Sequence, residues 1–209
     1  MARLNINAPI VQGHEFSGGS LSTSLLWQDL FYGWTASEIC IAIVTRTGRG
    51  GGKVLDRGSM AILWVTIVVS ITAGEWVAGT NPENMFGGSH WLKIAAIAVL
   101  IAGLAIRWTA ILSLGNAFSA NVAIRDTQTV YQSGVYRFVR HPSYTGLWLA
   151  FLAVALHERN WLAAAIVLAP TTAALFYRIH VEEAALHTAF GAQYETYCKT
   201  TKRLIPGIY

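Results

Sequence analysis

Residues 143–177, SYTGLWLAFLAVALHERNWLAAAIVLAPTTAALFY, contain two apolar runs separated only by the four polar residues 157–160. A helix that crosses a bilayer needs about 20 mostly apolar residues, and the first run, 143–156, is short by that measure. The connection between the runs predicts a tight antiparallel helical hairpin that need not cross the full bilayer vertically. Pro170 lies inside the second run, 161–177, where we expect it to kink the helix.

The composition of the whole chain indicates an integral membrane protein. Of its 209 residues, 54% are hydrophobic and only 12% are charged, and the mean hydropathy is +0.43. An ordinary soluble domain carries about 25% charged residues. The net charge of +4 is better explained by basic cytoplasmic loops than by nucleic-acid binding, so we expect no nucleic-acid partner. Two distant cysteines are too few for a metal site, and none is expected.

Three further apolar runs precede the hairpin, at residues 25–45, 59–77 and 91–112. The sequence therefore predicts an all-α integral membrane protein with about five transmembrane helices, a hairpin formed by the fourth and fifth, and a cytoplasmic C-terminal helical segment. Lysine and arginine occur between spans one and two, between three and four, and after five, but not between two and three. This pattern predicts an N-terminus outside and a C-terminus in the cytoplasm.

The chain divides into three predicted regions. Residues 1–24 form a polar N-terminal segment, residues 25–90 contain the first two spans as an accessory unit, and residues 91–209 form the core. Within the core, the helix of the fifth span continues past the membrane until Gly191, because glycine commonly follows a helix end. A second short helix is expected at about residues 192–200.

The run GVYRFVRHPSYTG, residues 134–146, concentrates polar groups at the start of the fourth span. Pro142 suits the first turn of that helix, which places His141 at the helix mouth. Helix N-termini attract anions, so this loop suits a carboxylate, a phosphate or the acidic end of a cofactor. Gly146 would permit close approach of a flat ligand such as a purine. The alternative is a basic juxtamembrane loop that only sets the topology.

A second polar group follows the fifth span. Arg178 and Glu182 are four residues apart and can meet on one helix face. Glu183 shares a stripe with Ile179 and Leu186, which turns this carboxylate toward the protein. A buried carboxylate is costly unless it is paired or binds a ligand. The alternatives are a solvated ion pair between Arg178 and Glu182 and a structural salt bridge from Glu183 to a loop arginine.

Asp29, Glu38 and Arg107 are charged residues inside the predicted spans, and such residues are candidates for function, although Asp29 lies near the outer end of its span. Glu38 and Arg107 fall in the inner halves of spans one and three. They can pair with each other, or Arg107 can reach the head group of a substrate.

Three stretches carry a resemblance to a known family: RWTAILSLGNAF (107–118), GVYRFVRHPSYTG (134–146) and RIHVEEAALHTAFGAQYETYCKTTKRLIPGIY (178–209). The chain resembles the isoprenylcysteine carboxyl methyltransferases and their bacterial relatives, which include phospholipid methyltransferases. The shared pattern is RHPxYxG, then R, EE and L, then FGxxYxxY and a closing proline. It covers just over half of the chain.

The resemblance implies helical spans with a cytoplasm-facing pocket for S-adenosyl-L-methionine. The implied cofactor-binding residues are Tyr136, Arg137, His141, Pro142, Tyr144, Gly146, Tyr194 and Tyr197. The implied catalytic residues, which orient the acceptor and balance charge, are Arg178, Glu182 and Glu183. Arg107 and Glu183 are the substrate-binding candidates. The implied partners are membrane lipids and a lipophilic or small-molecule acceptor, most simply an isoprenylcysteine-type carboxylate that enters sideways from the bilayer.

The acceptor decides the chemistry. A carboxylate can displace the sulfonium methyl group without a general base, so alignment and exclusion of water suffice. An amine or a thiol must lose a proton, which Glu182 or Glu183 could accept. Two other functions stay open. An NADPH-dependent enzyme like the membrane sterol reductases would share RHPxYxG-like motifs and the ending LIPGIY, and a non-catalytic membrane protein could keep the same fold.

Overall fold

A computed structural model describes residues 18–44, 53–54, 58–87, 90–115, 118, 123–124 and 129–209. The helices are α1 (Gly18–Val44), α2 (Ser59–Thr80), α3 (His90–Leu114), α4 (Pro142–Glu158), α5 (Trp161–Phe190) and α6 (Ala192–Thr200). Two short 3-10 helices, η1 (Pro82–Asn84) and η3 (Gly134–Arg137), and two short strands, β1 (Lys53–Val54) and β2 (Ala123–Ile124), complete the order. Most of the predicted N-terminal polar segment and of the first basic loop lies outside the described residues.

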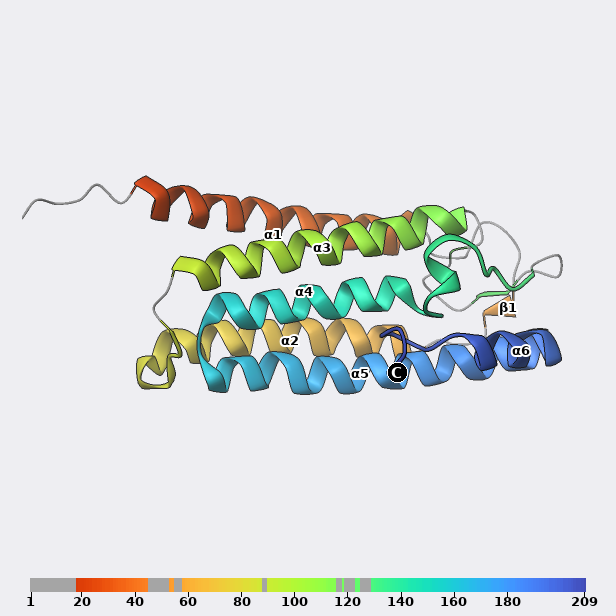
Figure 1. Cartoon of the computed structure of the whole chain (residues 1–209). Helices are drawn as coiled ribbons and strands as arrows, with labels where there is room; N and C mark the ends of the chain where they lie inside the picture. Colours follow the sequence, from red (N-terminus) through yellow and green to blue (C-terminus); the bar gives the residue numbers. More distant parts are fainter. Residues whose placement is uncertain are drawn as a thin grey trace, which may run out of the picture.

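Helices α1, α2, α3, α4 and α5 lie side by side and form an elongated bundle (Figure 1). Helix α4 packs mainly against α3 and α5, while α2 packs against α5 and α1 lies against α3. Leu100, Phe151 and Leu175 are fully buried where these helices meet. The predicted all-α class is confirmed, with β1 and β2 adding only one antiparallel pairing of two residues each. η3, α6 and both short strands gather at one end of the bundle (Figure 1).

The hairpin of α4 and α5 is confirmed, and its turn depends on two residues. Arg159 adopts a left-handed conformation with φ of 51°, which ends α4. Asn160 then caps α5, because its side-chain oxygen accepts a hydrogen bond of 3.0 Å from the Ala163 N–H. Helix α5 includes Pro170 and ends at Phe190, with Gly191 as its C-cap, as the sequence predicts for that glycine. The kink expected at Pro170 stays a prediction.

The helices lie where the apolar runs predict them, but not every helix is long enough to count as a membrane span. Helices α2, α3 and α5 are long and apolar enough to cross a membrane by length and composition. Helix α4 has only 17 residues, which is short for a vertical crossing. Helix α1 begins at Gly18, earlier than the predicted start at residue 25. Three spans are thus supported within the described part of the chain, and the count of five stays a prediction.

Glycines bring α3 and α4 into close contact. A Cβ atom added at Gly103 would lie 2.7 Å from the carbonyl oxygen of Gly146. A Cβ atom added at Gly146 would lie 2.7 Å from the backbone nitrogen of Arg107. These are clashes, so each glycine lets the partner backbone approach. The expectation that Gly146 makes room for a flat ligand is therefore corrected, since α3 occupies that space.

Candidate active site

One cavity of about 1360 Å³, including the part open to solvent, lies within the bundle near the end that carries η3 and α6. Its walls fall into two parts, which we call the polar half and the apolar half. The polar half is lined by Tyr136, Arg140, His141, Tyr144, Glu182, Tyr194 and Tyr197. The apolar half is lined mainly by residues of α1 and α2, namely Trp34, Ile41, Ala42, Met60, Leu63, Trp64 and Ile67. The first two helices thus form walls of the same cavity as the motif residues.

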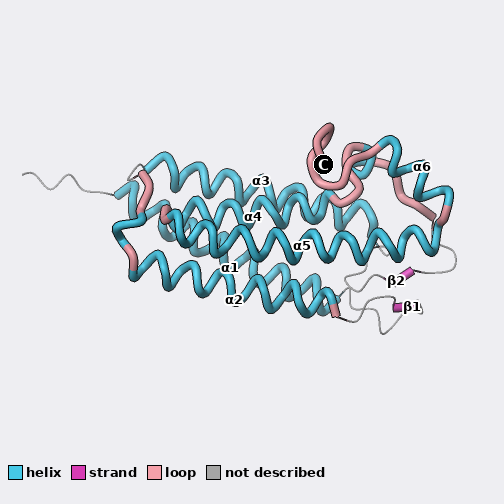
Figure 2. The backbone as a smooth tube through the Cα atoms, turned by 90° about the horizontal axis from the view of Figure 1, so that it is seen from below, coloured by secondary structure: helices cyan, strands magenta, loops and turns pink. Residues whose placement is uncertain are grey.

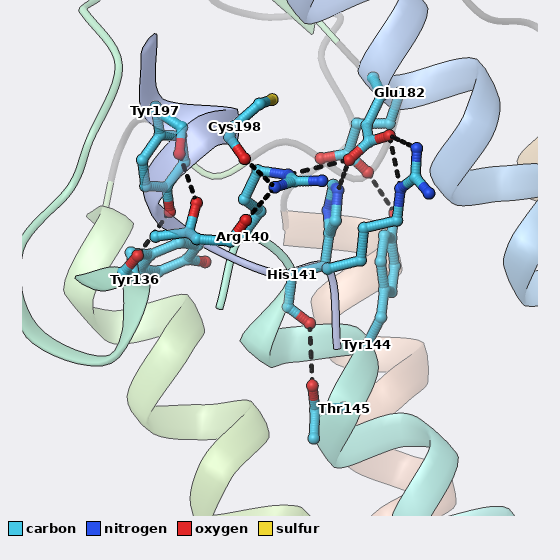
Figure 3. A network of polar contacts seen from close by, with 11 residues as sticks. Tyr136, Arg140, His141, Tyr144, Thr145, Glu182, Tyr197 and Cys198 are labelled. Carbon is cyan, nitrogen blue, oxygen red and sulfur yellow. Dashed lines mark hydrogen bonds and ion pairs between the residues drawn. The ribbon is translucent and has the colours of Figure 1, made fainter. Parts of the chain in front are cut away.

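Tyr144 connects the two predicted catalytic residues Arg178 and Glu182. Its hydroxyl donates to Glu182 Oε2 at 2.6 Å and accepts from Arg178 Nε at 3.1 Å (Figure 3). Arg178 is fully buried, with 0% of its surface exposed, and its Nη1 donates to Ser59 Oγ at 2.6 Å. A solvent-exposed pair between Arg178 and Glu182 is therefore excluded. Glu182 lines the cavity, whereas Arg178 is not among the lining residues and contacts the Tyr144 hydroxyl from the protein interior.

Glu183 has a different environment from its neighbour Glu182. It is 6% exposed, as the predicted helix stripe requires. Its Oε1 accepts a hydrogen bond from Arg140 Nε at 3.0 Å and lies 3.4 Å from His141 Nε2. Its Oε2 accepts from Arg203 Nε at 2.8 Å. Glu183 thus forms the salt bridge to a loop arginine that the sequence offered as an alternative. Its partners are Arg140, Arg203 and His141.

After α6 the chain turns back beside α5 (Figure 2), and its residues 202 and 203 bond to the backbone of the 139–141 loop. The N–H of Arg140 donates to the carbonyl of Lys202 at 2.8 Å, and the N–H of His141 donates to that of Arg203 at 2.9 Å. The Thr145 hydroxyl donates to the Leu204 carbonyl at 2.8 Å. Backbone pairing between two distant segments therefore positions the first residues of the polar half.

The side chain of Arg140 completes this connection, as Figure 3 shows. Its Nη1 donates to the carbonyl of Cys198 at 3.3 Å and also to the carbonyl of Thr201. One guanidinium thus joins the loop before α4, Glu183 on α5 and the end of α6. Planar guanidinium groups with several donors suit such a junction better than a single ammonium does.

Three buried tyrosines form the other wall of the polar half. The Tyr136 hydroxyl donates to the Ala110 carbonyl at 3.3 Å, and the Tyr197 hydroxyl donates to the Tyr136 carbonyl at 2.5 Å. The Tyr194 hydroxyl is buried and has no hydrogen-bond partner of normal geometry among the described residues. Burial raises the pKa of Tyr197 to about 12 and those of Tyr136 and Tyr194 further above the ordinary value. All three hydroxyls are therefore neutral at physiological pH.

Glu38 and Arg107 form a buried, bidentate ion pair between α1 and α3. The Trp34 indole donates to Glu38 Oε1 at 3.2 Å, and Arg107 Nη1 donates to Ser143 Oγ at 2.8 Å. The predicted pairing of the two charges is thus present. Arg107 also lines the cavity, but Glu38 and Ser143 engage its Nε and both terminal nitrogens.

The cavity brings together most, but not all, of the predicted site residues. The predicted residues that line it are Arg107, Tyr136, His141, Tyr144, Glu182, Tyr194 and Tyr197. Arg137 is exposed and stacks over the Phe138 ring, with 4.4 Å from Cζ to the ring centroid. Pro142 is buried as the first residue of α4. Neither these two residues nor Gly146, Arg178 and Glu183 are among the described residues that line the cavity.

Sequence reasoning missed Arg140 and Arg203 as members of the site. A signal for Arg140 was present, because it directly precedes His141 in the motif. The sequence around Arg203 gives no comparable signal, since it lies 20 residues after Glu183, beyond a helix end and a turn.

Comparisons with known proteins find similar sequences and a similar fold in one family. Residues 96–188 match the model of the isoprenylcysteine carboxyl methyltransferase family. The protein-S-isoprenylcysteine O-methyltransferase of Tribolium castaneum is 33% identical over 57% of this chain and 43% of its own length. Protein-S-isoprenylcysteine O-methyltransferase B of Arabidopsis thaliana is 28% identical over 81% of this chain and 86% of its own length.

A solved structure is similar as well. The structure of the eukaryotic intramembrane Ras methyltransferase ICMT superimposes with a TM-score of 0.58 at 28% identity, covering 69% of this chain and 52% of that one. The chain thus spans about half the length of that protein and of the Tribolium relative. Its three long apolar helices and this relationship identify an integral membrane protein. By sequence over residues 96–188 and by fold, the chain is similar to the isoprenylcysteine carboxyl methyltransferase family.

Proposed function

We propose that this chain transfers a methyl group from S-adenosyl-L-methionine to the carboxylate of a lipophilic acceptor of the isoprenylcysteine type. The observation that carries the proposal is that one cavity has both polar and apolar lining residues. A cofactor with charged and aromatic parts needs the first kind of wall, and an acceptor with a hydrocarbon chain needs the second. The methyl donor and the acceptor can then bind next to each other in the same cavity.

The residues of the polar half fit the cofactor. The buried Tyr194 hydroxyl lacks a partner of normal geometry among the described residues, and a buried polar group of this kind is costly unless a ligand satisfies it. Glu182 presents a carboxylate to a cavity that would receive a cationic cofactor. The residues that would hold the cofactor are Tyr136, His141, Tyr144, Tyr194 and Tyr197. The cofactor supplies an activated methyl group on a sulfonium, so a carboxylate acceptor needs no general base.

The chain's own residues provide alignment, charge balance and exclusion of water. Tyr144 holds the Glu182 carboxylate in place, and Arg178 fixes the Tyr144 hydroxyl from the protein side. The apolar half encloses the hydrocarbon part of the acceptor and leaves its carboxylate near the polar half. Arg178 and Glu183 support this arrangement from outside the cavity wall, and Arg107 borders it while paired with Glu38.

The orientation follows from the loop charges, and we infer an N-terminus outside with the C-terminus and the site in the cytoplasm. The start of α1 and the end with η3 and α6 lie at opposite ends of the bundle, which supports this assignment (Figure 1). Protease access to a tag at each terminus, in sealed vesicles of known orientation, tests it. Cleavage of both tags from the same side would contradict it.

Purified protein in detergent tests the activity. Incubation with radiolabelled S-adenosyl-L-methionine should label a farnesylated cysteine that has a free carboxylate, and should not label its methyl ester. The matched control for the protein is Glu182→Gln, which keeps a similar shape but lacks the charge. Equal labelling of the free acid and the ester would contradict methyl transfer to the carboxylate.

Ligand-dependent thermal stability separates the proposed function from the reductase alternative, because a ligand that binds only the folded protein raises its apparent stability. S-adenosylhomocysteine should raise the unfolding temperature, and NADPH should not. The methyltransferase names of the relatives favour this outcome. Stabilisation by NADPH alone would support a sterol-reductase-like enzyme instead.

A further inference from the structure

We propose that Arg203 is a positioning residue that holds the His141 ring against the cavity by fixing Glu183 between them. This inference rests on the proposed function, because it concerns the side chain with which the polar half receives its cofactor. Arg203 itself is not among the described residues that line the cavity. Its effect on a ligand must therefore pass through other side chains.

The side-chain contacts define the path. Arg203 reaches Glu183 with two nitrogens, since Nε and Nη2 both lie 2.8 Å from Oε2. The other carboxylate oxygen, Oε1, is left for Arg140 at 3.0 Å and for His141 Nε2 at 3.4 Å. With Oε2 held from one side, the carboxylate cannot rotate away from the His141 ring. Two donors in a fixed planar group restrict that rotation better than one donor does.

The backbone adds a second contact between the same two residues. The N–H of His141 donates to the carbonyl of Arg203 at 2.9 Å, beside a parallel bridge between Val139 and Lys202. Arg203 therefore contacts His141 directly through its main chain and indirectly through its side chain. A substitution of the side chain removes the second contact, and also the contact of the guanidinium with the Tyr209 ring, whereas the main-chain carbonyl remains.

Two features make this proposal testable without loss of folding. The side chain of Arg203 is 40% exposed, so its removal leaves no large buried hole. Glu183 also keeps Arg140, so the carboxylate is not left unpaired. Lys202 offers a matched control, because it is an exposed neighbour with the same charge and its carbonyl also pairs with the loop. Lys202→Met and Arg203→Met thus remove the same charge from adjacent positions.

The first measurement reports on the ring and needs no ligand. Protein labelled with ¹⁵N-histidine gives imidazole signals, and His141→Gln identifies the one from His141. We expect Arg203→Met to shift or broaden that signal, and Lys202→Met to leave it unchanged. Arg203→Lys should restore it in part, since one donor to Glu183 is recovered. A merely structural role for Arg203 would not single out the His141 ring.

The second measurement is the affinity for S-adenosylhomocysteine. We expect Arg203→Met to weaken binding about tenfold, because it removes a charge-assisted hydrogen bond that orders the site, whereas Lys202→Met should stay within about twofold. In turnover assays the KM for the methyl donor should rise, with little change in kcat.

The outcomes separate the two proposals. An unchanged His141 signal in Arg203→Met, or equal effects of Arg203→Met and Lys202→Met, would overturn the positioning role. A shifted signal in a protein whose wild-type form does not bind S-adenosylhomocysteine would support the positioning role and refute the proposed function. A shifted signal together with weakened binding supports both.

Discussion

The two halves of the cavity are built by different means. In the polar half, directional bonds connect segments far apart in the sequence, such as Arg140 with Glu183 and His141 with Arg203. The apolar half is formed by the side chains of two helices, and it depends on their shape and spacing. The two meet near the buried pair of Glu38 and Arg107, where Arg107 also bonds to Ser143 at the start of α4.

The polar half should tolerate substitutions less well than the apolar half. In a network of charged hydrogen bonds each group is positioned by its neighbours, so the removal of one member changes the geometry of the others. An apolar wall accepts substitutions of similar volume at small cost. We therefore expect cofactor binding to be sensitive to single substitutions in the polar half, and acceptor selectivity to vary gradually with residues of α1 and α2.

The largest effect should come from the boundary between the halves. Replacing Glu38 by Ala leaves the Arg107 charge buried without its carboxylate and should lower the free energy of unfolding by about 3–5 kcal/mol. Denaturant unfolding in detergent measures the loss. The double variant Glu38→Leu, Arg107→Met should recover much of it, because no charge then remains buried. A single variant as stable as wild type would show that this pair does not hold α1.

A second large effect concerns the carboxylate that faces the cavity. Glu182→Gln should reduce kcat/KM about 100-fold, which corresponds to about 2.7 kcal/mol, because the negative charge opposite a cationic cofactor is lost. Glu195→Gln on the exposed face of α6 is the control and should have wild-type activity. Similar losses in both variants would mean that overall charge, and not the polar half, determines the rate.

The close contact between α3 and α4 at Gly146 should have a smaller effect on stability. Gly146→Ala places a methyl group against the α3 backbone and should lower stability by about 1–3 kcal/mol. Gly33→Ala on α1 is the control, because a Cβ atom there meets nothing within 4 Å and alanine favours a helix. Thermal unfolding measures both variants. A neutral Gly146→Ala would show that α3 and α4 can separate without cost.

The smallest effect should appear in the apolar half. Ala42→Leu fills space in the cavity and should raise KM for a long-chain acceptor about tenfold, as expected for excluding roughly two methylene groups. Affinity for S-adenosylhomocysteine should stay unchanged. Ala36→Leu, on the exposed side of the same helix, serves as the control. If Ala42→Leu also weakened S-adenosylhomocysteine binding, the cavity would not divide into two halves.

Local patterns predicted the helices well. Periodicity, the proline at position 142 and the glycine at position 191 depend on neighbouring residues, and the structure places α4, α5 and α6 where they indicate. The stripe that turns Glu183 inward is local as well. The pairing of Glu38 with Arg107 was one of two alternatives. A charge inside an apolar span needs a partner, but the sequence alone does not identify that partner.

The remaining features depend on the tertiary arrangement. The contact of Gly146 with α3 follows from how two helices cross, and the glycine alone does not distinguish a helix from a ligand as the neighbour. The bond from Arg178 to Ser59 joins residues 119 positions apart. Arg203 reaches Glu183 only because the chain reverses direction after α6. A single sequence contains no local signal for such contacts.

The pairing of the 139–141 loop with residues 202–204 also has a consequence for biosynthesis. A ribosome makes the apolar helices first, and they can enter the bilayer while translation continues. The loop acquires its partners only after residue 204 has emerged. The helices of a nascent chain can therefore enter the bilayer before the polar half is assembled, and we expect the proposed methyl transfer only after this segment has been translated.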